Sequence, residues 1–419
     1  MNQNIWGNHL WFVLHTISFN YPINPTEKDK QNMRKFLESL QTKDMWDIIP
    51  ESVKELHSLF KSAGKTLFVV GGSVRDFLNN DKPKDFDLAT DATPDEVLSI
   101  IGKKWRTTVQ GESFFVVVVY TEDQPMGMEI ATFREDVYGD LLGKTRNPVT
   151  KFSTIDKDVE RRDLTWNALF YDLEKRTIID LVNGIEDLNN KITRFVGDPD
   201  MRIIEDPLRI MRLCRFTARY GFTIEQGTRE SIHKNKDKLK IIVRNRIWDE
   251  FYKAYGQVKD FTIYLKYLDE FGLWEYVFPG MEINSDITSC SSLELYLANL
   301  FVDDQPVNFD FESFKNKLVQ NLFIPIEISR VVSYLIWLQD FEPERVTEFY
   351  TKRNNFKISD EMISEWLEIT RNLSVMCDVF VKYKPTTNSQ DLMSKGFKGK
   401  SLGDEIKRLE IEKFKQMLN

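Results

Sequence analysis

The chain has few cysteines for its length and no long apolar run. Three cysteines occur in 419 residues, with no metal-ligand or redox spacing: Cys214, Cys290 and Cys377. No run of about 18 apolar residues could span a membrane, and no basic segment followed by an apolar stretch opens the chain. These absences disfavour a disulfide scaffold, a cysteine metal site, a membrane protein and a secreted protein. We expect a soluble cytoplasmic protein.

Positive charge is also scarce. The 57 Lys and Arg residues against 65 Asp and Glu residues give a formal net charge of −8. Because sequence-independent affinity for nucleic acid comes from Lys and Arg that neutralise phosphates, this balance disfavours a protein coated with nucleic acid. Any RNA contact must be local. The basic clusters at residues 209–219 and 395–400 are either such contacts or solvated faces.

Hydrophobic patterning changes along the chain. Short apolar or alternating runs predict the strands of a small mixed sheet at residues 67–70, 85–88, 114–120, 128–133 and 177–181. A helix that starts after Gly71 and Gly72 is expected to be capped by Ser73, and residues 136–151 predict a mobile loop. Amphipathic helical patterns dominate after about residue 200. The expected fold is an α+β head with a mixed sheet, followed by all-α regions.

Asp85 and Asp87 are the first candidates for chemistry. On a strand, residues i and i+2 point to the same face, and carboxylate oxygens suit Mg²⁺. A solvated strand edge is the alternative for such a pair taken alone. Upstream, Gly72 lets backbone N–H groups approach a phosphate at a helix N-terminus, and Arg75 in the first turn is placed to pair with phosphate oxygens. The segment therefore predicts a joint metal and phosphate site.

These residues carry a resemblance to a known family. Residues 71–76, followed by residues 84–88, resemble the first motif of class II tRNA nucleotidyltransferases and bacterial poly(A) polymerases. The resemblance continues in order through residues 129–134, 158–168, 180–188 and 205–209. It implies a nucleotidyltransferase head and a nucleotide site that includes Gly72, Ser73, Arg75, Arg162, Asp163, Asp206, Arg209, Arg212 and Arg215. It also implies a third catalytic carboxylate, Glu129, and base selection by Glu205, Asp206 and Arg209.

Several of these roles have alternatives. Glu129 is either a base or metal ligand, or a surface carboxylate on an edge strand. Asp206 and Arg209, at i and i+3 of one helical turn, either select cytosine and adenine by hydrogen bonding or form a helix-surface ion pair. Arg162 and Asp163 either recognise the ribose of the nucleotide or take part in an ion pair with Asp158.

The resemblance implies template-independent addition of CCA to the 3′ end of tRNA from CTP and ATP. Two Mg²⁺ ions held by Asp85 and Asp87 would stabilise the attacking hydroxyl oxygen and the departing pyrophosphate. The alternatives are a bacterial-type poly(A) polymerase and a non-catalytic RNA-binding protein that retained the fold. Residues 111–117 are nearer to the CCA-adding pattern, whereas residues 139–148 depart from the family's aspartate-glycine-arginine-proline-like loop, which leaves addition of the terminal A open.

Five segments are expected along the chain. They are an N-terminal helical extension (1–50), the head (51–175), a neck that selects the base (176–255), a helical body (256–335) and a helical tail that binds tRNA (336–419). Residues 6–22 resemble the opening helix of FAD-linked sulfhydryl oxidases. Oxidase chemistry is not expected, because it needs a Cys-x-x-Cys pair and no cysteine precedes Cys214. No pattern in the sequence indicates the oligomeric state.

Overall fold

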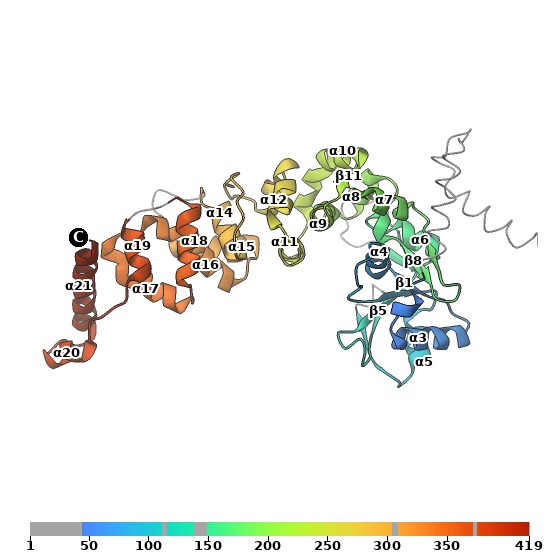
Figure 1. Cartoon of the computed structure of the whole chain (residues 1–419), viewed down its shortest axis with the longest axis horizontal. Coiled ribbons are helices and arrows are strands. Elements are labelled where there is room, and N and C mark those ends of the chain that lie inside the picture. Colours follow the sequence, from blue (N-terminus) through green and yellow to red (C-terminus); the bar gives the residue numbers. More distant parts are fainter. Residues whose placement is uncertain (1–43, 111–114, 138–148, 304–308, 372–374, 419) are drawn as a thin grey trace, which may run out of the picture. The chain divides into compact units, whose positions relative to one another are not determined.

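The structure is a computed structural model that describes residues 44–110, 115–137, 149–303, 309–371 and 375–418 (Figure 1). Contacts divide the chain into two compact units, Met1–Lys238 and Leu239–Asn419. The first unit contains the sheet and the second is helical. The finer domain boundaries expected at residues 175, 255 and 335 remain predictions.

A seven-stranded sheet forms the centre of the first unit, with the strand order β3-β4-β5-β2-β1-β8-β9. The β2–β5 pair is parallel and the other neighbouring pairs are antiparallel, so the sheet is mixed, as predicted. The strands are β1 (Leu67–Val70), β2 (Asp87–Thr90), β3 (Arg106–Gln110), β4 (Val116–Tyr120), β5 (Met128–Thr132), β8 (Phe170–Asp172) and β9 (Thr177–Ile179).

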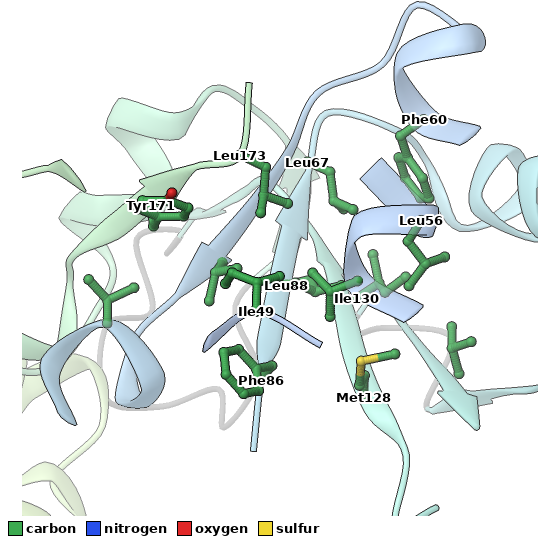
Figure 2. Packing of buried hydrophobic residues seen from close by; sticks show 14 of the residues in the cluster. Ile49, Leu56, Phe60, Leu67, Phe86, Leu88, Met128, Ile130, Tyr171 and Leu173 are labelled. Carbon is green, nitrogen blue, oxygen red and sulfur yellow. The ribbon is translucent and has the colours of Figure 1, made fainter. Parts of the chain in front are cut away.

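Two helices cover one face of this sheet, α3 (Glu51–Ser62) and α5 (Pro94–Ile101) (Figure 1). Their buried side chains pack with alternate residues of the strands, and Figure 2 shows Leu56 and Phe60 beside Leu67, Leu88 and Ile130. Burial of each such side chain contributes about 1.5–3 kcal/mol. This cluster holds β2 and β5 in place beneath the carboxylates that they carry.

The other face of the sheet carries a second core cluster. Phe68 and Val70 of β1 point into it, together with Phe170 and with Val159 of α6 (Ile155–Glu160). Because Leu67 and Val69 point into the first cluster, β1 is buried on both faces, which explains its uninterrupted apolar run.

Short helices and strands complete the first unit. They are η1 (Trp46–Ile48), α4 (Gly72–Leu78), η2 (Thr165–Asn167), α7 (Gly184–Asn190), α8 (Pro199–Glu205), α9 (Arg209–Tyr220), α10 (Gln226–Asn235), the parallel pair β10 (Ile192–Thr193) and β11 (Thr223–Ile224), and the hairpin β6 (Arg134–Val137) and β7 (Val149–Phe152). A further 3-10 helix, η3 (Lys236–Ile241), runs across the division between the units.

The second unit is helical throughout its described residues. Its helices are α11 (Arg244–Gln257), α12 (Phe261–Glu270), α13 (Trp274–Val277), α14 (Leu293–Leu300), α15 (Phe311–Leu322), α16 (Ile326–Trp337), η4 (Leu338–Asp340), η5 (Pro343–Arg345), α17 (Val346–Asn355), α18 (Asp360–Ile369), α19 (Val375–Lys382), α20 (Ser389–Ser394) and α21 (Gly399–Leu418). Aromatic side chains fill its core; the rings of Trp337 and Phe349, for example, stack with centroids 3.8 Å apart. In the described part of the chain, no helix combines the length and the apolar character needed to cross a membrane.

Three local predictions were wrong. Gly71, not Ser73, is the N-cap of α4, and the Ser73 hydroxyl donates instead to the carbonyl of Val70 at 3.3 Å. The ends of the predicted loop at residues 136–151 lie in the β6–β7 hairpin, whereas residues 138–148 lie outside the described chain. The strand expected at Asp85 begins at Asp87, because β1 pairs with β2 only from Asp87 onward.

Candidate active site

Three carboxylates, Asp85, Asp87 and Glu129, lie close together near the start of β2 and β5. These strands pair in parallel with Leu88 opposite Ile130, so Asp87 and Glu129, each one residue earlier, are neighbours. Leu88 and Ile130 point into the core beneath α3 and α5, as does Phe86 (Figure 2). Because side chains alternate along a strand, Asp87 and Glu129 share the opposite face, and Asp85, two residues before Asp87, is close enough to raise the pKa of Asp87.

The electrostatics of Asp87 reflect this crowding. Burial of the carboxyl, followed by repulsion from Asp85 and Glu129, raises the pKa of Asp87 to about 6, and Arg162 opposes the rise. The residue still exposes surface to solvent, as Asp85 and Glu129 do, so the three carboxylates can be reached from outside. Among the described residues, none of the three forms an ion pair with a Lys or Arg side chain. A cation at this position would relieve their repulsion.

The residues present fit Mg²⁺. No three His, Cys, Asp or Glu side chains within the described ranges converge closely enough to enclose a metal ion by themselves. Mg²⁺ does not require such a cage, since it keeps several waters and is held by one or two carboxylates plus the phosphates of a substrate. Asp85 and Asp87, whose side chains are both exposed, would supply the carboxylates.

The glycine turn before α4 adjoins this face. Gly71 has φ 68° and ψ −119°, a conformation open to glycine, and a Cβ there would lie 3.6 Å from Nη1 of Arg162. The turn therefore brings the start of α4, with Gly72 and Ser73, next to a guanidinium that also acts on Asp87. Ser73 itself is buried.

Arg75 has protein partners rather than the expected phosphate oxygens. Its Nε donates to Asp76 at 2.8 Å and its Nη1 donates to Oδ1 of Asn167 at 2.5 Å. The guanidinium also lies over the rings of Trp166 and Tyr220, 5.6 and 4.9 Å from their centroids, and the residue is 5% exposed. Arg75 thus joins α4 to η2 and α9. Asn167, whose side-chain oxygen accepts from Arg75, lies within residues 158–168 of the family resemblance, and no pattern in the sequence predicted this contact.

Asp158 organises two arginines beside the carboxylates. It accepts from Nε of Arg161 at 2.8 Å and from Nε and Nη2 of Arg162 at 3.2 and 3.0 Å. Burial alone would raise the pKa of the Asp158 carboxyl, but the charges of Arg162 and Arg161 hold it below its ordinary value. The ion pair considered as the alternative for Arg162 is therefore present. The same guanidinium still lies close enough to Asp87 to lower its pKa.

Asp163, which follows Arg162 in the chain, contacts helix α9. Its Oδ2 accepts from Nε and Nη2 of Arg212 at 3.0 and 2.6 Å, and its Oδ1 accepts from the N–H of Leu164 at 2.8 Å. Burial alone would raise the pKa of Asp163, but the attraction and hydrogen bonds of Arg212, with the bond from Leu164, lower it to about 2. Asp163 is thus ionised at neutral pH and fixes Arg212, which stays 35% exposed.

The proposed base-selecting residues are arranged differently from the prediction. Helix α8 ends at Glu205 and α9 begins at Arg209, so Asp206 lies in extended backbone between two helices and not in a shared helical turn. Arg209 pairs with Glu205 at 2.7 Å, and both side chains are about nine-tenths buried. Arg209 also donates to the carbonyls of Arg202 and Arg161 at 3.0 and 2.8 Å. The Glu205–Arg209 ion pair is therefore buried and is not a solvated pair on the helix surface.

Helix α9 does not present an open cationic stripe. Arg209 and Arg215 are 9% and 3% exposed, and the Arg215 guanidinium lies 4.2 Å from the centroid of the Phe216 ring. Among Arg209, Arg212 and Arg215, which follow one another at intervals of three residues, only Arg212 keeps substantial exposure. Residues 161–163 thus link the carboxylate face of the sheet to α9, through Arg162 on one side and Asp163 on the other.

Two family models match, one within the first unit and one across the boundary between the two units. Residues 67–194 match the Poly A polymerase head domain. Residues 221–284 match a region described as the probable RNA and SrmB-binding site of polymerase A.

Curated relatives match about half of the chain. A CCA-adding enzyme of Lactobacillus helveticus is 40% identical over 208 residues, which cover 49% of this chain and 50% of the relative. Poly(A) polymerase I of Escherichia coli O157:H7 is 32% identical over 248 residues, covering 56% and 50%. The human mitochondrial CCA tRNA nucleotidyltransferase 1 is 37% identical over 227 residues, covering 52% and 50%. The chain thus spans about half the length of these relatives.

Solved structures share the fold over most of the chain. The Bacillus stearothermophilus CCA-adding enzyme in complex with CTP matches with a TM-score of 0.64 at 23% identity, over 86% of this chain and 91% of that one. The Thermotoga maritima CCA-adding enzyme complexed with tRNA matches with a TM-score of 0.63 at 20% identity, over 90% and 97%. The similarity of residues 6–22 to sulfhydryl oxidases has no support in these comparisons, and those residues lie outside the described chain. Residues 67–194 thus match the head domain of poly(A) polymerases, and the chain is similar to CCA-adding enzymes and to bacterial poly(A) polymerases alike.

Proposed function

We propose that this chain is a cytoplasmic enzyme that adds CCA to the 3′ end of tRNA from CTP and ATP without a nucleic-acid template. The observation that carries the proposal is the carboxylate face formed by Asp85, Asp87 and Glu129, with Arg162 beside it. Nucleotidyl transfer needs this combination, because negative charge grows on the attacking and leaving oxygens and must be balanced on both sides.

In the proposed reaction, the 3′-hydroxyl of the tRNA attacks the α-phosphorus of the nucleotide. A new P–O bond forms, the bond between the α- and β-phosphates breaks, and pyrophosphate leaves. Asp85 and Asp87 would hold two Mg²⁺ ions, whose chemistry is to stabilise charge on the attacking and departing oxygens. Glu129 would accept the proton of the hydroxyl, and its position beside Asp87 across the β2–β5 pair supports this role.

The residues between the sheet and α9 would recognise the nucleotide. Asp163 and Arg162 would contact the ribose, whose 2′-hydroxyl both donates and accepts hydrogen bonds. Arg212, whose Nε and Nη2 donate to Asp163, is partly exposed and would donate to a base through Nη1, and the Asp206 carboxylate would accept. Glu205 would act on the base indirectly in this scheme, by fixing the fork of Arg209.

The relatives support nucleotide addition to RNA, but they include enzymes with two different products, CCA ends and poly(A) tails. The CCA-adding enzymes among them support addition to tRNA, and the match of residues 221–284 to a probable RNA-binding region supports an RNA partner. Poly(A) polymerase I of Escherichia coli matches over a similar length, so addition of long A tails is the second candidate. We further propose that the helical body and tail bind tRNA.

The test is incorporation of each labelled NTP, with Mg²⁺, onto tRNA that ends before CCA, after C or after CC, followed by sequencing of the products. Growth that stops at CCA supports the proposal, and it also decides whether the enzyme with its divergent segment at residues 139–148 adds the terminal A. Long A tails would favour poly(A) polymerase. Absence of transfer onto all three primers, with RNA binding retained, would favour the non-catalytic alternative.

Variants separate the two-metal site from general effects of charge. Asp85→Asn and Asp87→Asn are expected to lower transfer by at least about a thousandfold, because each removes a metal ligand at nearly constant volume. Asp95→Asn is the matched control, since Asp95 is an exposed aspartate on α5. Transfer by either site variant at the rate of Asp95→Asn would exclude the metal assignment.

A further inference from the structure

A cavity in the second unit combines positive charge with aromatic rings. It has a volume of about 410 Å³ and is lined by residues of α15, α16 and α17: Phe311, Glu312, Lys315, Arg330, Lys352, Asn355 and Phe356. This volume lies within the range of about 300–1,000 Å³ typical of small-molecule sites. The residues that line it are called the α15–α17 pocket below. None of them belongs to the candidate active site.

The charge of the α15–α17 pocket is not balanced internally. Lys315 forms an ion pair with Glu312, one turn away on α15. Within the described part of the chain, neither Arg330 nor Lys352 forms an ion pair with a carboxylate. The ammonium of Lys352 instead lies 4.2 Å from the centroid of the Phe311 ring. Two cations therefore remain to meet an anion, although the chain as a whole is acidic.

The aromatic residues of the pocket favour an anion that carries a flat ring. The rings of Phe311 and Phe356 are nearly parallel, at 7° with centroids 5.8 Å apart, and Phe311 packs in turn on Trp337. Phe311 is buried, whereas Phe356, at the end of α17, keeps part of its surface exposed. A flat ring that entered the pocket would extend this stack, and an aromatic contact with a base contributes about 1–3 kcal/mol.

We propose that the α15–α17 pocket binds a phosphorylated nucleoside, with its phosphate on Arg330 and Lys352 and its base against Phe356. The ligand is either a free nucleotide or one nucleotide of an RNA strand, since both present the same phosphate and base. Arg330 can engage phosphate oxygens with two parallel N–H groups, and Lys352 adds a point charge. This site goes beyond the proposed transfer reaction, because it lies in the helical unit and needs no metal.

Photo-crosslinking to the full chain tests the site without requiring catalysis. The two probes are 8-azidoadenosine 5′-monophosphate and a single-stranded RNA that carries the same modified base, and adducts are located by mass spectrometry of peptides. We expect adducts within residues 311–315 or 352–356. Labelling by the mononucleotide identifies a free nucleotide as a ligand, and labelling by the RNA alone identifies a strand.

Three variants decide which contacts matter. Arg330→Gln combined with Lys352→Gln should raise the probe concentration for half-maximal labelling by about tenfold or more, because two phosphate contacts are lost. Phe356→Leu should weaken labelling while leaving the charge unchanged. Lys266→Gln, which removes an exposed cation on α12, should leave labelling unchanged.

Adducts absent from both segments, or adducts unaffected by the double variant, would overturn the proposal. Labelling of residues 67–194 in the same experiment reports separately on the active site. A failure at the α15–α17 pocket is therefore distinguishable from a failure of the proposed function.

Discussion

The pair formed by Asp163 and Arg212 supports a quantitative prediction about the junction between the sheet and α9. The pKa of Asp163 falls from 3.8 to about 2, and each unit corresponds to about 1.36 kcal/mol of preference for the charged form. The full shift thus corresponds to roughly 2–2.5 kcal/mol. Since Arg212 is 35% exposed, solvent screens part of the attraction, and we expect about 1–2 kcal/mol of coupling between the side chains.

The sign of the pH dependence follows from the direction of the shift. A carboxyl whose pKa is lowered in the folded state stabilises the fold fully above its unfolded pKa, here about 4, and this contribution is lost as the pH falls toward about 2. At pH 7 the pair is therefore at full strength. Measurements at that pH avoid the other carboxyl groups that titrate in acid.

A double-mutant cycle at pH 7 measures the coupling. The variants are Asp163→Asn, Arg212→Gln and the combination, and the free energy of unfolding is taken from urea titration. Because the chain has two units, hydrogen exchange of α9 amides identifies the transition that belongs to the first unit. The control cycle uses Lys157→Gln and Glu160→Gln, an exposed i, i+3 pair on α6, for which no coupling should be resolved. Coupling at Asp163 no larger than in this control would refute the reasoning.

Four further predictions concern other positions. Gly184→Ala should cost about 1–3 kcal/mol of unfolding free energy in urea titration, because a Cβ there overlaps the carbonyl of Thr165; stability equal to wild type would contradict this. Because protonation of Asp87 below about pH 6 competes with Mg²⁺, the Mg²⁺ concentration for half-maximal transfer should fall from pH 5 to pH 7 and then level off, and a flat profile would argue against metal binding there. Without metal, the raised pKa of Asp87 favours the fold at low pH, and that contribution is lost as the pH rises through about 6. Glu410→Gln should cost about 1–3 kcal/mol and speed amide exchange at residues 383–387, because its buried carboxylate accepts a tyrosine hydroxyl and two backbone N–H groups; unchanged exchange would rule this out. Arg209→Lys should weaken the preference for CTP and ATP by about tenfold in assays with all four NTPs, since one ammonium cannot replace a fork with three acceptors, and wild-type preference would exclude a role in selection.

Patterns with a short period predicted the sheet well. Alternation between polar and apolar residues predicted the exposed Asp87 and the buried Phe86 and Leu88 on either side of it, because the side chains of an extended chain alternate. The apolar run of β1 matched its bounds of Leu67–Val70, since that strand is buried on both faces. The edges of elements were less predictable. The strand expected from Asp85 starts two residues later, because pairing with β1 and not propensity decides where β2 begins.

Side-chain partners were harder to predict than elements. Arg75 follows a phosphate-binding type of turn, yet an aspartate, an asparagine and several aromatic rings surround its guanidinium. The spacing of Asp206 and Arg209 predicted a shared helical turn, but the chain leaves the helix at Asp206, and Arg209 pairs with Glu205. Such partners come from distant segments or from a break between helices, and periodicity carries no information about either.

The sequence by itself indicated the resemblance to nucleotidyltransferases and the mixed sheet followed by helices, because ordered motifs and strand alternation are local properties, whereas the catalytic role of the carboxylates stays a prediction. Only the tertiary structure decided that Glu129 lies beside Asp87, that Asp163 pairs with Arg212 of α9, and that the α15–α17 pocket holds unneutralised cations. These facts depend on which strands and helices become neighbours. That choice is made by burial of side chains from segments far apart in the chain, and no local pattern contains it.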